Sequence, residues 1–291
     1  MCGIAGFYLK NTFNEKENVL KLMNDKLSHR GPDGEGFFID NNVSFSHKRL
    51  AIIDLNERSN QPYISKDKNY IITFNGEIYN YLELRKILIL DGFSFLTTSD
   101  TEVLLNSYIR WGEEMLQKIK GMFAFSIYDK KKNIIFCARD HFGQKPFFYY
   151  YLNGNFIFSS ELTSLMTHPI IKKELCIRSI CNYLHYDSFV GSTTPLKNCY
   201  KLLPSQYMIF NINDQSLNKK NYWNIKIENE KISHDDNYDR FIDKLTQSTK
   251  RHLRSDVPVG LYLSGGIDSS TLACLSRSVL KNDNIDAFNL K

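Results

Sequence analysis

The chain has 291 residues, of which 42% are hydrophobic and 24% charged, with a formal net charge of +5 at pH 7; this balance is typical of a globular protein with one large or two ordinary domains. Its Lys and Arg residues are scattered, with short clusters such as residues 130–132 at an expected turn, which excludes a nucleic-acid-binding surface. No apolar run approaches about 18 residues, so we expect no membrane insertion. No basic segment precedes an apolar one at the N-terminus, so we expect no export either. Without an export signal, the six cysteines indicate reduced thiols in a cytoplasmic protein.

The first notable residue is Cys2, which follows the initiator methionine in the run Met-Cys-Gly-Ile-Ala-Gly. Small second residues generally permit removal of Met1, which would leave a thiol and a free α-amine on one residue, a nucleophile with its own base. Reference pKa values of about 8.5 for a thiol and about 7.7–8 for an α-amine leave much of the amine unprotonated near neutrality. Taken alone, a second-residue cysteine is more often a simple buried residue than a catalytic one.

Six segments between residues 43 and 160 are predicted as β-strands, because they are rich in β-branched and aromatic residues. They cover residues 43–54, 70–74, 122–128, 133–139, 146–152 and 155–160. Asn153-Gly154 separates the last two, which is typical of a tight β-hairpin.

Two helices are predicted between these strands. The first follows Asn75-Gly76 and ends near Gly92, and four of its apolar residues lie roughly on one face. These are Ile78, Tyr81, Leu82 and Leu88. The second opens at Ser99, which with Glu102 three residues later forms a capping box, and it runs through about residue 111. Two helices among many antiparallel strands favour an α+β fold of layered sheets flanked by helices.

The cysteines in the middle of the chain favour packing over metal binding. Cys176, Cys181 and His185 are spaced Cys-x4-Cys-x3-His, without the tighter pairs that zinc sites favour, so an apolar helix face is the preferred interpretation. Cys137 lies in an apolar strand and Cys274 on an expected helix, and both are predicted to be core residues.

A linker is predicted at residues 211–235, which are rich in Asn, Lys and Asp. Beyond it, four residues form a helical stripe. They are Tyr238, Phe241, Ile242 and Leu245. Val257–Leu263 then predicts a buried strand, and the string Ser-Gly-Gly-Ile-Asp-Ser-Ser follows it at residues 264–270. A predicted helix to about Lys281 and a second strand at Ile285–Leu290 complete a βαβ unit.

The glycine-rich turn of this unit is a candidate phosphate site. A strand-to-helix turn gathers backbone N–H groups at a helix N-terminus, where anionic oxygens bind. The turn is not a Walker loop, since no lysine follows its glycines, and it lacks the Gly-x-Gly-x2-Gly of dinucleotide folds. Its Ser hydroxyls and the Asp268 carboxylate, which is able to hold Mg²⁺, indicate a different phosphate cradle; the alternative is a tight turn capped by Ser264.

With these residues in view, the chain resembles the glutamine-dependent asparagine synthetase family. Residues 2–210 resemble a class II glutamine amidotransferase domain, which implies the N-terminal nucleophile hydrolase fold, an αββα sandwich of two antiparallel sheets. Residues 236–291 resemble the start of an ATP-pyrophosphatase (PP-loop) domain, here an incomplete α/β domain. The motifs occur along nearly the whole chain in the family's order: Met-Cys-Gly-Ile-Ala-Gly at 1–6, His-Arg-Gly-Pro-Asp at 29–33, Arg-Leu-Ala-Ile-Ile-Asp at 49–54, Phe-Asn-Gly-Glu-Ile-Tyr-Asn at 74–80, Ser-Asp-Thr-Glu at 99–102, Gly-Met-Phe-Ala-Phe at 121–125, Arg-Asp-x2-Gly-x-Lys-Pro at 139–146 and Ser-Gly-Gly-Ile-Asp-Ser-Ser at 264–270.

For the first domain, the resemblance implies glutamine hydrolysis without any cofactor. Cys2 matches the nucleophile, and the Asn75 side-chain amide with the Gly76 backbone N–H matches the oxyanion hole. The implied glutamine-binding residues are Arg49, Leu50, Ile52, Ile53, Asn75, Gly76, Glu77 and Asp100. Among these, Arg49 matches the clamp on the substrate α-carboxylate, and Glu77 and Asp100 match the acceptors for its α-ammonium.

Simpler roles remain open for these residues. The alternatives are that Asn75-Gly76 is a turn, that Asp100 only favours a helix N-terminus, and that Arg49 is an exposed strand residue. The preferred role of Arg30 and Asp33, from the 29–33 motif, is to shape the loop near the nucleophile.

For the second domain, the resemblance implies ATP and Mg²⁺. The residues expected around the nucleotide are Tyr262, Leu263, Ser264, Gly265, Gly266, Asp268, Ser269, Ser270 and Leu290, and Asp268 is the candidate Mg²⁺ ligand. In the family, the carboxylate of aspartate attacks ATP to give an acyl-adenylate, and ammonia crosses an internal tunnel to complete the amide. The expected small-molecule partners are therefore glutamine, ATP and aspartate, and the resemblance leaves a homodimer open.

The chain departs from the family in its length, because members continue far beyond the pyrophosphate loop. We expect a fragment or a truncated gene product in preference to half of a split enzyme, with apolar surface exposed on the last 56 residues. The leading hypothesis is an asparagine synthetase competent here only as a glutaminase. The alternatives are an amidotransferase that delivers ammonia to another carboxylate, of a glycan or peptide, and a catalytically silent interaction fragment; fructose-6-phosphate amidotransferases lack the pyrophosphate loop and rank low.

Overall fold

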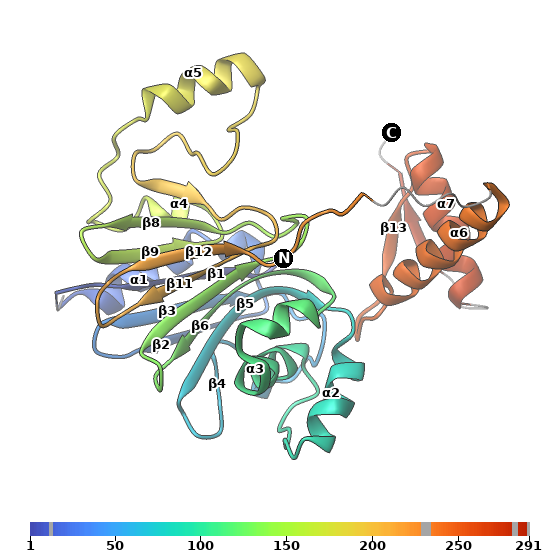
Figure 1. Ribbon diagram of the computed structural model, residues 1–291, viewed down its shortest axis with the longest axis horizontal. Helices are drawn as coiled ribbons and strands as arrows, with labels where there is room; N and C mark the ends of the chain where they lie inside the picture. Colours follow the sequence, from blue (N-terminus) through green and yellow to red (C-terminus); the bar gives the residue numbers. More distant parts are fainter. Residues whose placement is uncertain (12–13, 228–233, 281–284, 290–291) are drawn as a thin grey trace. The chain divides into compact units, whose positions relative to one another are not determined.

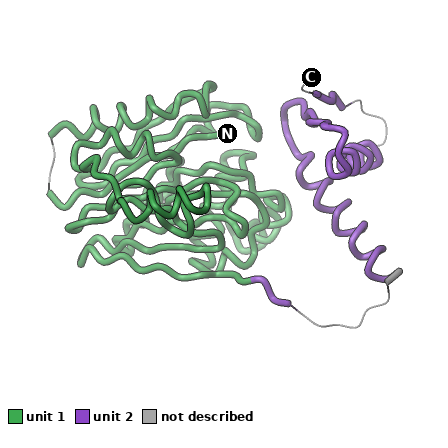
Figure 2. The backbone as a smooth tube through the Cα atoms, turned by 90° about the horizontal axis from the view of Figure 1, so that it is seen from above, with its two compact units in different colours: residues 1–224 green, residues 225–291 purple. Residues whose placement is uncertain are grey.

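The computed structural model describes residues 1–11, 14–227, 234–280 and 285–289, and the chain divides into two units, residues 1–224 and 225–291 (Figure 2). In the described part of the chain, no helix is both long enough and apolar enough to cross a membrane.

Unit 1 is built on two six-stranded sheets, in which every neighbouring pair of strands is antiparallel (Figure 1). The first sheet has the order β10 (Cys199–Lys201), β8 (Phe148–Leu152), β9 (Asn155–Ser159), β1 (Gly3–Tyr8), β3 (Val43–Arg49) and β2 (Gly34–Ile39). The second has the order β12 (Leu217–Asn221), β11 (Gln206–Asn211), β7 (Ile134–Arg139), β6 (Gly121–Asp129), β5 (Tyr70–Ile78) and β4 (Tyr63–Ile64).

Helices cover the outer face of each sheet. On the first sheet lie α1 (Lys16–Asp25) and α4 (Leu162–Leu165), and on the second lie α2 (Tyr81–Leu90) and α3 (Asp100–Trp111). The remaining helix of unit 1, α5 (Ile177–Tyr186), projects away from both sheets (Figure 1). The described residues of unit 1 also contain three short 3₁₀ turns: Ser28–Arg30, Glu57–Ser59 and Gly112–Gln117.

The alternation of side chains along the strands explains this layering. In β1, Ile4 and Tyr8 point into the central apolar layer between the sheets, whereas Ala5 and Phe7 point outward into the layer beneath α1 and α4. A strand with apolar side chains on both faces must be covered on both faces, because successive side chains point to opposite sides. The unit is therefore a four-layer α/β/β/α sandwich, as the sequence predicted.

Strand β5 is longer than predicted. Asn75 and Gly76, expected at the end of the strand, pair within it with Ala124 and Phe123 of β6, and the ladder continues to Ile78. The predicted helix therefore begins only at Tyr81. Asn75-Gly76 is consequently not a turn, and both residues lie on a rigid strand.

Strand β3 is shorter than predicted, because the chain leaves the sheet after Arg49 and residue 54 adopts a left-handed backbone with φ of 49°.

The capping box at α3 also differs from expectation. The Ser99 hydroxyl accepts a hydrogen bond from Thr101 N at 3.1 Å. The buried Glu102 carboxylate, however, accepts from Leu96 N and Thr97 N, at 2.7–3.1 Å, and Ser99 N donates to Thr97 Oγ1 instead. The hairpin at Asn153-Gly154 is confirmed.

Part of the predicted linker is structured. Residues 217–221 form β12, which pairs with β11 in the second sheet, so polar composition there marks a solvent-facing strand. The predicted linker extends to residue 235, and its residues 228–233 lie outside the described part of the chain.

Unit 2 contains α6 (His234–His252), β13 (Gly260–Tyr262), α7 (Ile267–Leu280) and β14 (Asp286–Phe288), and β13 pairs with β14 in parallel, which gives the predicted βαβ order. Both strands are shorter than predicted, and residues 281 and 290 lie outside the described residues. Several apolar side chains of this unit are exposed, including Tyr262 at 81%. Cys274, predicted to be a core residue, is exposed, whereas Cys137 is buried as predicted.

Candidate active site

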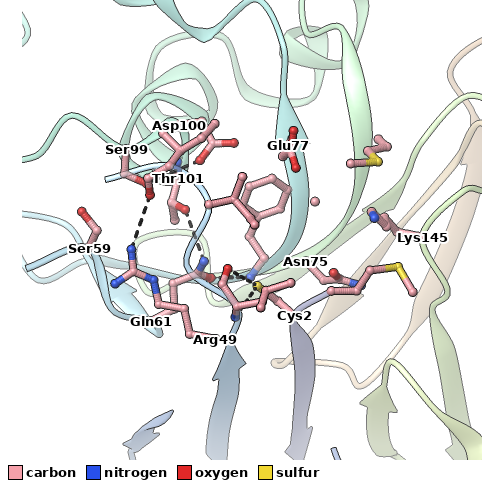
Figure 3. Close-up of a pocket in the computed structure, with 17 residues that line it drawn as sticks. Cys2, Arg49, Ser59, Gln61, Asn75, Glu77, Ser99, Asp100, Thr101 and Lys145 are labelled. Atoms are coloured by element: carbon pink, nitrogen blue, oxygen red, sulfur yellow. Dashed lines mark hydrogen bonds between the residues drawn. The ribbon is translucent and has the colours of Figure 1, made fainter. Parts of the chain in front are cut away.

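A cavity of about 150 Å³ opens in unit 1 where β1, β3, β5 and the start of α3 converge (Figure 3). It brings together every residue that the sequence analysis assigned to glutamine: Cys2, Arg49, Leu50, Ile52, Ile53, Asn75, Gly76, Glu77 and Asp100. Pockets for drug-sized ligands usually measure about 300–1,000 Å³. This smaller cavity therefore suits a compound the size of an amino acid.

Cys2 lies at the start of β1 with its thiol against the chain that leaves β3. Its Sγ accepts a hydrogen bond from Leu50 N at 3.3 Å and lies 3.6 Å from Leu50 O. Burial raises the pKa of the Cys2 thiol, and the Leu50 N–H opposes that rise. The sulfur is thus held as a thiol near neutral pH, and a nucleophilic reaction needs a base to remove its proton.

Two charged residues fix the chain on either side of this thiol. Arg30 donates from Nε to Cys2 O at 2.9 Å and from Nη1 to the carboxylate of Glu161 at 2.9 Å. Asp33 accepts a hydrogen bond from Ala51 N at 2.9 Å. Both side chains therefore shape the loops beside Cys2.

Asn75 presents an unused donor to the cavity. The residue is only 1% exposed, and its Nδ2 atom has no hydrogen-bond partner among the residues that the structure describes. A buried donor without an acceptor is costly, typically by about 1–3 kcal/mol, and calls for an explanation such as a role in ligand binding or catalysis. The neighbouring Gly76 is required by space, because a Cβ there would lie 2.1 Å from Met122 O.

Two carboxylates, Glu77 and Asp100, line the same cavity. Asp100 is buried at the first turn of α3 and accepts a hydrogen bond from Ile78 N at 2.9 Å. Burial raises the pKa of Asp100 to about 7, the Ile78 N–H opposes this, and the charge of Glu77 adds to it. A cation bound near both carboxylates would favour the ionised form of Asp100 and so lower its pKa.

Arg49 ends β3 and is 7% exposed, which is at odds with an exposed strand position. Its Nη1 donates to Asn56 O at 2.9 Å and to Asn60 Oδ1 at 2.8 Å, and its Nη2 donates to Ile53 O at 3.4 Å and to Asp54 O. The guanidinium therefore holds the 50–60 loop, which forms one wall of the cavity. A substrate carboxylate would have to share these donors.

Sequence reasoning missed eight residues that also line the cavity. They are Met1, Ser59, Gln61, Phe74, Ser99, Thr101, Met122 and Lys145. Gln61 joins two walls, since its Oε1 accepts from Phe74 N at 2.6 Å and its Nε2 donates to Thr101 Oγ1 at 3.2 Å. Nothing in its local sequence signals this role, whereas Lys145 stands inside the motif at 139–146 and could have been identified from it.

The predicted pyrophosphate turn lies in unit 2 between β13 and α7. Gly265 adopts a left-handed backbone, with φ of 82°, and Ser264 Oγ lies 3.1 Å from Ser269 Oγ. The turn is exposed, and hydroxyls with a helix N-terminus are a donor set suited to phosphate oxygens. Asp268, Ser269 and Ser270 lie in the first turn of α7, and Tyr262 and Leu263 lie at the end of β13; Leu290 falls outside the described residues.

No group of three or more His, Cys, Asp or Glu side chains that could hold a metal ion occurs in the described ranges of the chain. Asp268 thus belongs to no such group, and a Mg²⁺ ion there would need phosphate oxygens and water among its ligands. Cys181 is exposed on α5, and Cys176 immediately precedes that helix.

Comparison with protein families gives two matches. The family model described as a glutamine amidotransferase domain matches residues 1–223, and the model described as asparagine synthase matches residues 240–291.

Curated relatives match nearly all of the chain. Asparagine synthetase [glutamine-hydrolyzing] 3 of Bacillus subtilis is 38% identical over 280 residues, which cover 95% of this chain and 45% of the relative. A putative asparagine synthetase [glutamine-hydrolyzing] 2 of Methanocaldococcus jannaschii is 37% identical over 320 residues, which cover 100% of this chain and 59% of the relative. The chain thus spans about half the length of the curated relatives it matches.

Among solved structures, the glutamine phosphoribosylpyrophosphate amidotransferase of B. subtilis is similar, with a TM-score of 0.56 and 18% sequence identity, covering 99% of this chain and 65% of that one. At this identity the likeness concerns the fold alone. It confirms the predicted N-terminal nucleophile hydrolase sandwich of two antiparallel sheets.

Proposed function

The chain belongs to the glutamine amidotransferase domain family, and from this we propose that unit 1 hydrolyses glutamine to glutamate and ammonia, with Cys2 as the nucleophile after removal of Met1. The observation that carries this proposal is the buried Nδ2 of Asn75, which has no partner among the described residues and belongs to a residue that lines the same cavity as Cys2. A hydrogen-bond donor without an acceptor, near a nucleophile, is expected in an oxyanion hole, because the negative charge that it stabilises develops only during the reaction.

The α-amine of Cys2 would act as the base, because burial keeps the thiol protonated. As Sγ bonds to the side-chain amide carbon of glutamine, its proton passes to the amine. The tetrahedral oxyanion then collapses, the C–N bond breaks, and the ammonium returns the proton to the leaving nitrogen, so that ammonia departs from a γ-glutamyl thioester. Water, deprotonated by the same amine, adds to the thioester carbon and releases glutamate and the thiol.

The rest of the cavity would orient the substrate. Asn75 Nδ2 and the Gly76 N–H would donate to the oxyanion, and the carboxylates of Glu77 and Asp100 would accept from the α-ammonium. Arg49 would share its donors between the 50–60 loop and the α-carboxylate. Leu50, Ile52 and Ile53 would then form the apolar part of the wall, along the aliphatic chain of glutamine.

The test is glutamate release from glutamine by the purified chain, together with labelling by an electrophilic glutamine analogue. We expect both activities in the wild type and neither in Cys2→Ala, while Cys181→Ala, which removes an exposed thiol, retains both. Intact mass spectrometry must find Met1 removed in the active material. Glutamate release that survives in Cys2→Ala would overturn the proposal.

We further propose that residues 236–291 begin a synthetase domain and that the whole protein amidates aspartate with ATP. The match of residues 240–291 to the asparagine synthase model and the names of the relatives support this. Ser264, Gly265, Gly266, Ser269 and Ser270 would bind the pyrophosphate, with Tyr262 and Leu263 near adenine and Asp268 holding Mg²⁺. ATP, when bound, supplies the phosphorus centre that activates the acceptor carboxylate.

Residues 240–291 alone carry the synthase match, so we propose that these 291 residues release ammonia without forming asparagine. Incubation with glutamine, ATP, Mg²⁺ and aspartate, followed by amino-acid analysis, tests this. Glutamate without asparagine is the expected result, and asparagine formation would contradict it. The same assay with a longer chain and other carboxylates would separate aspartate from a glycan or peptide acceptor.

A further inference from the structure

The loop that follows β7 is held by an unusually dense set of buried hydrogen bonds. Asp140 is 0% exposed, and its two carboxylate oxygens accept four backbone N–H bonds at 2.9–3.2 Å. The donors are Phe123, Phe142, Gln144 and Lys145. Since Phe123 lies on β6, opposite Gly76 of β5, the carboxylate ties this loop to the strand that faces the Asn75-Gly76 segment.

Arg139 secures the other side of the same loop. It donates from Nε to Lys145 O at 2.7 Å, from Nη2 to Gly143 O at 2.7 Å and from Nη1 to Leu202 O at 2.6 Å. Bonds of this kind, with one charged partner, are stronger than neutral ones. Together, the two side chains fix the backbone of Lys145 from both of its peptide groups.

The fixed backbone delivers the Lys145 side chain to the cavity. Lys145 lines it together with Cys2, Asn75 and Glu77 (Figure 3) and is only 6% exposed. Within residues 1–11, 14–227, 234–280 and 285–289, no hydrogen bond or ion pair engages its ammonium group. Lysine is rarely buried without a partner, because removing its charge from water is costly. Such a position is therefore more consistent with a functional than with a packing role.

Several charged side chains lie around the N-terminus and the cavity. They are Arg30, Asp33, Arg49, Glu77, Asp100, Lys145 and Glu161. Two of the cations interact with other parts of the protein: Arg30 forms an ion pair with Glu161, and Arg49 donates hydrogen bonds to the 50–60 loop. Lys145 is the cation in this group whose side chain makes no hydrogen bond or ion pair with the described residues, and Glu77 is the carboxylate that acts most strongly on its charge.

We propose that Lys145 is a positioning residue for the glutaminase step, whose ammonium keeps the α-amine of the processed N-terminus uncharged and so available as the base. This inference rests on the proposed function of Cys2. The physical basis is that two positive charges in one small, poorly hydrated cavity repel each other strongly, and the group with the lower proton affinity gives up its proton. An amine that is neutral before the substrate binds can accept the thiol proton at once.

The electrostatics of the free N-terminus agree with this arrangement. Burial is the main effect that lowers the pKa of the terminal amine, here that of Met1. The positive charges of Lys145 and Arg30 also lower it, whereas Asp33 and any ionised fraction of Cys2 raise it. Burial also lowers the pKa of Lys145, while the carboxylate of Glu77 opposes that shift and helps it keep its proton.

The test is the pH dependence of kcat at saturating glutamine, measured for the full chain with Met1 removed. At saturating glutamine the substrate ammonium keeps Asp100 ionised. The decrease of kcat at low pH, the acid limb of the profile, therefore reflects protonation of the catalytic base, the α-amine of Cys2. In Lys145→Met we expect that limb to move to higher pH by about one unit, so that kcat at pH 6.5 falls about tenfold while kcat at pH 9 stays within about twofold. Lys145→Arg should retain the wild-type limb, and so should Lys86→Met, which removes an exposed lysine of α2.

An equal loss of kcat at every pH in Lys145→Met and Lys145→Gln would indicate a structural role and overturn the proposal, as would a raised KM with an unmoved limb. NMR titration of the N-terminal amine supplies a readout that does not require turnover. A wild-type chain without glutaminase activity defeats the proposed function, whereas an amine whose titration is the same in wild type and Lys145→Met defeats the role of Lys145 itself.

Discussion

At the scale of single residues, the cavity is distinguished by polar groups that are better suited to binding a ligand than to stabilising a core. Asn75 buries a donor that the described residues leave unused, and Asp100 buries a carboxylate beside a second one. Both features cost folding free energy. Buried polar groups that lower stability in this way are typical of functional sites.

Replacing Asn75 should therefore affect catalysis more than folding. For Asn75→Ala we expect kcat for glutamine hydrolysis to fall by about 10²–10³-fold, the loss typical of one oxyanion donor. The free energy of unfolding should change little from the loss of Nδ2, because that atom has no partner among the described residues. Steady-state kinetics and urea denaturation would measure the two effects, and a large loss of stability with intact kcat would contradict this account.

Asp100 should make glutamine binding depend on pH. Its pKa of about 7 means that the ionised form, which accepts the substrate ammonium, is lost as the pH falls below neutrality. We expect 1/KM for glutamine to fall about tenfold per pH unit below about 7 and to level off above it. Asp100→Asn should abolish this dependence and raise KM about 10- to 100-fold at pH 8, because it removes a charge-assisted bond.

The same carboxyl affects stability with the opposite sign. Its folded-state pKa lies above the value of about 3.9 expected in the unfolded chain, so the folded state binds the proton more tightly. The stabilisation that this provides is complete below about pH 4 and is lost as the pH rises through 7. Asp100→Asn should accordingly unfold no more easily than the wild type at pH 8, which thermal denaturation at that pH would check.

At the scale of elements, the start of α3 joins fold and site. Ser99 caps the helix through its bond to Thr101 N, and the next residue, Asp100, reaches the cavity. Ser99→Ala should lower the free energy of unfolding by about 1 kcal/mol, the usual effect of losing such a cap. A urea titration would show it, with Ser188→Ala in the loop after α5 as the control that leaves stability unchanged.

How far the sequence predicts these elements depends on how local their causes are. The α3 helix and the hairpin at Asn153-Gly154 were predicted closely, because a cap and a two-residue turn are local signals. The extension of β5 through Gly76 was not, since it depends on pairing with β6 some 45 residues away. Strand β12 was missed for a related reason: its polar, lysine-containing sequence is a strand only because β11 lies beside it.

The candidate site divides in the same way. Residues within recognisable motifs, such as Cys2 and Asp100, could be assigned from the sequence and lie together in the cavity. Gln61 could not, because its value lies in bridging β5 and α3, which only tertiary structure brings together. The Arg49 bonds to the 50–60 loop were equally hidden, since they depend on the path of that loop.

At the scale of the whole molecule, the two units differ in how well each is supported by its own core. The three buried apolar clusters and the complete cavity belong to residues 1–224. We therefore expect a chain ended at Asn224 to fold and to retain the kcat and KM for glutamine of the full chain within about threefold. Circular dichroism and glutaminase kinetics would test this, and failure of the shortened chain to fold would show that unit 1 needs unit 2.

The position of the Cys2 sulfur also bears on how the protein survives oxidative stress. Peroxides and general alkylating agents react with thiolates far more readily than with thiols, and with accessible sulfur more readily than with enclosed sulfur. Burial against Leu50 keeps this sulfur in its protonated form. We therefore expect Cys2 to form sulfenic acid more slowly than an exposed thiolate would, and to react fastest with electrophiles that bind in the cavity.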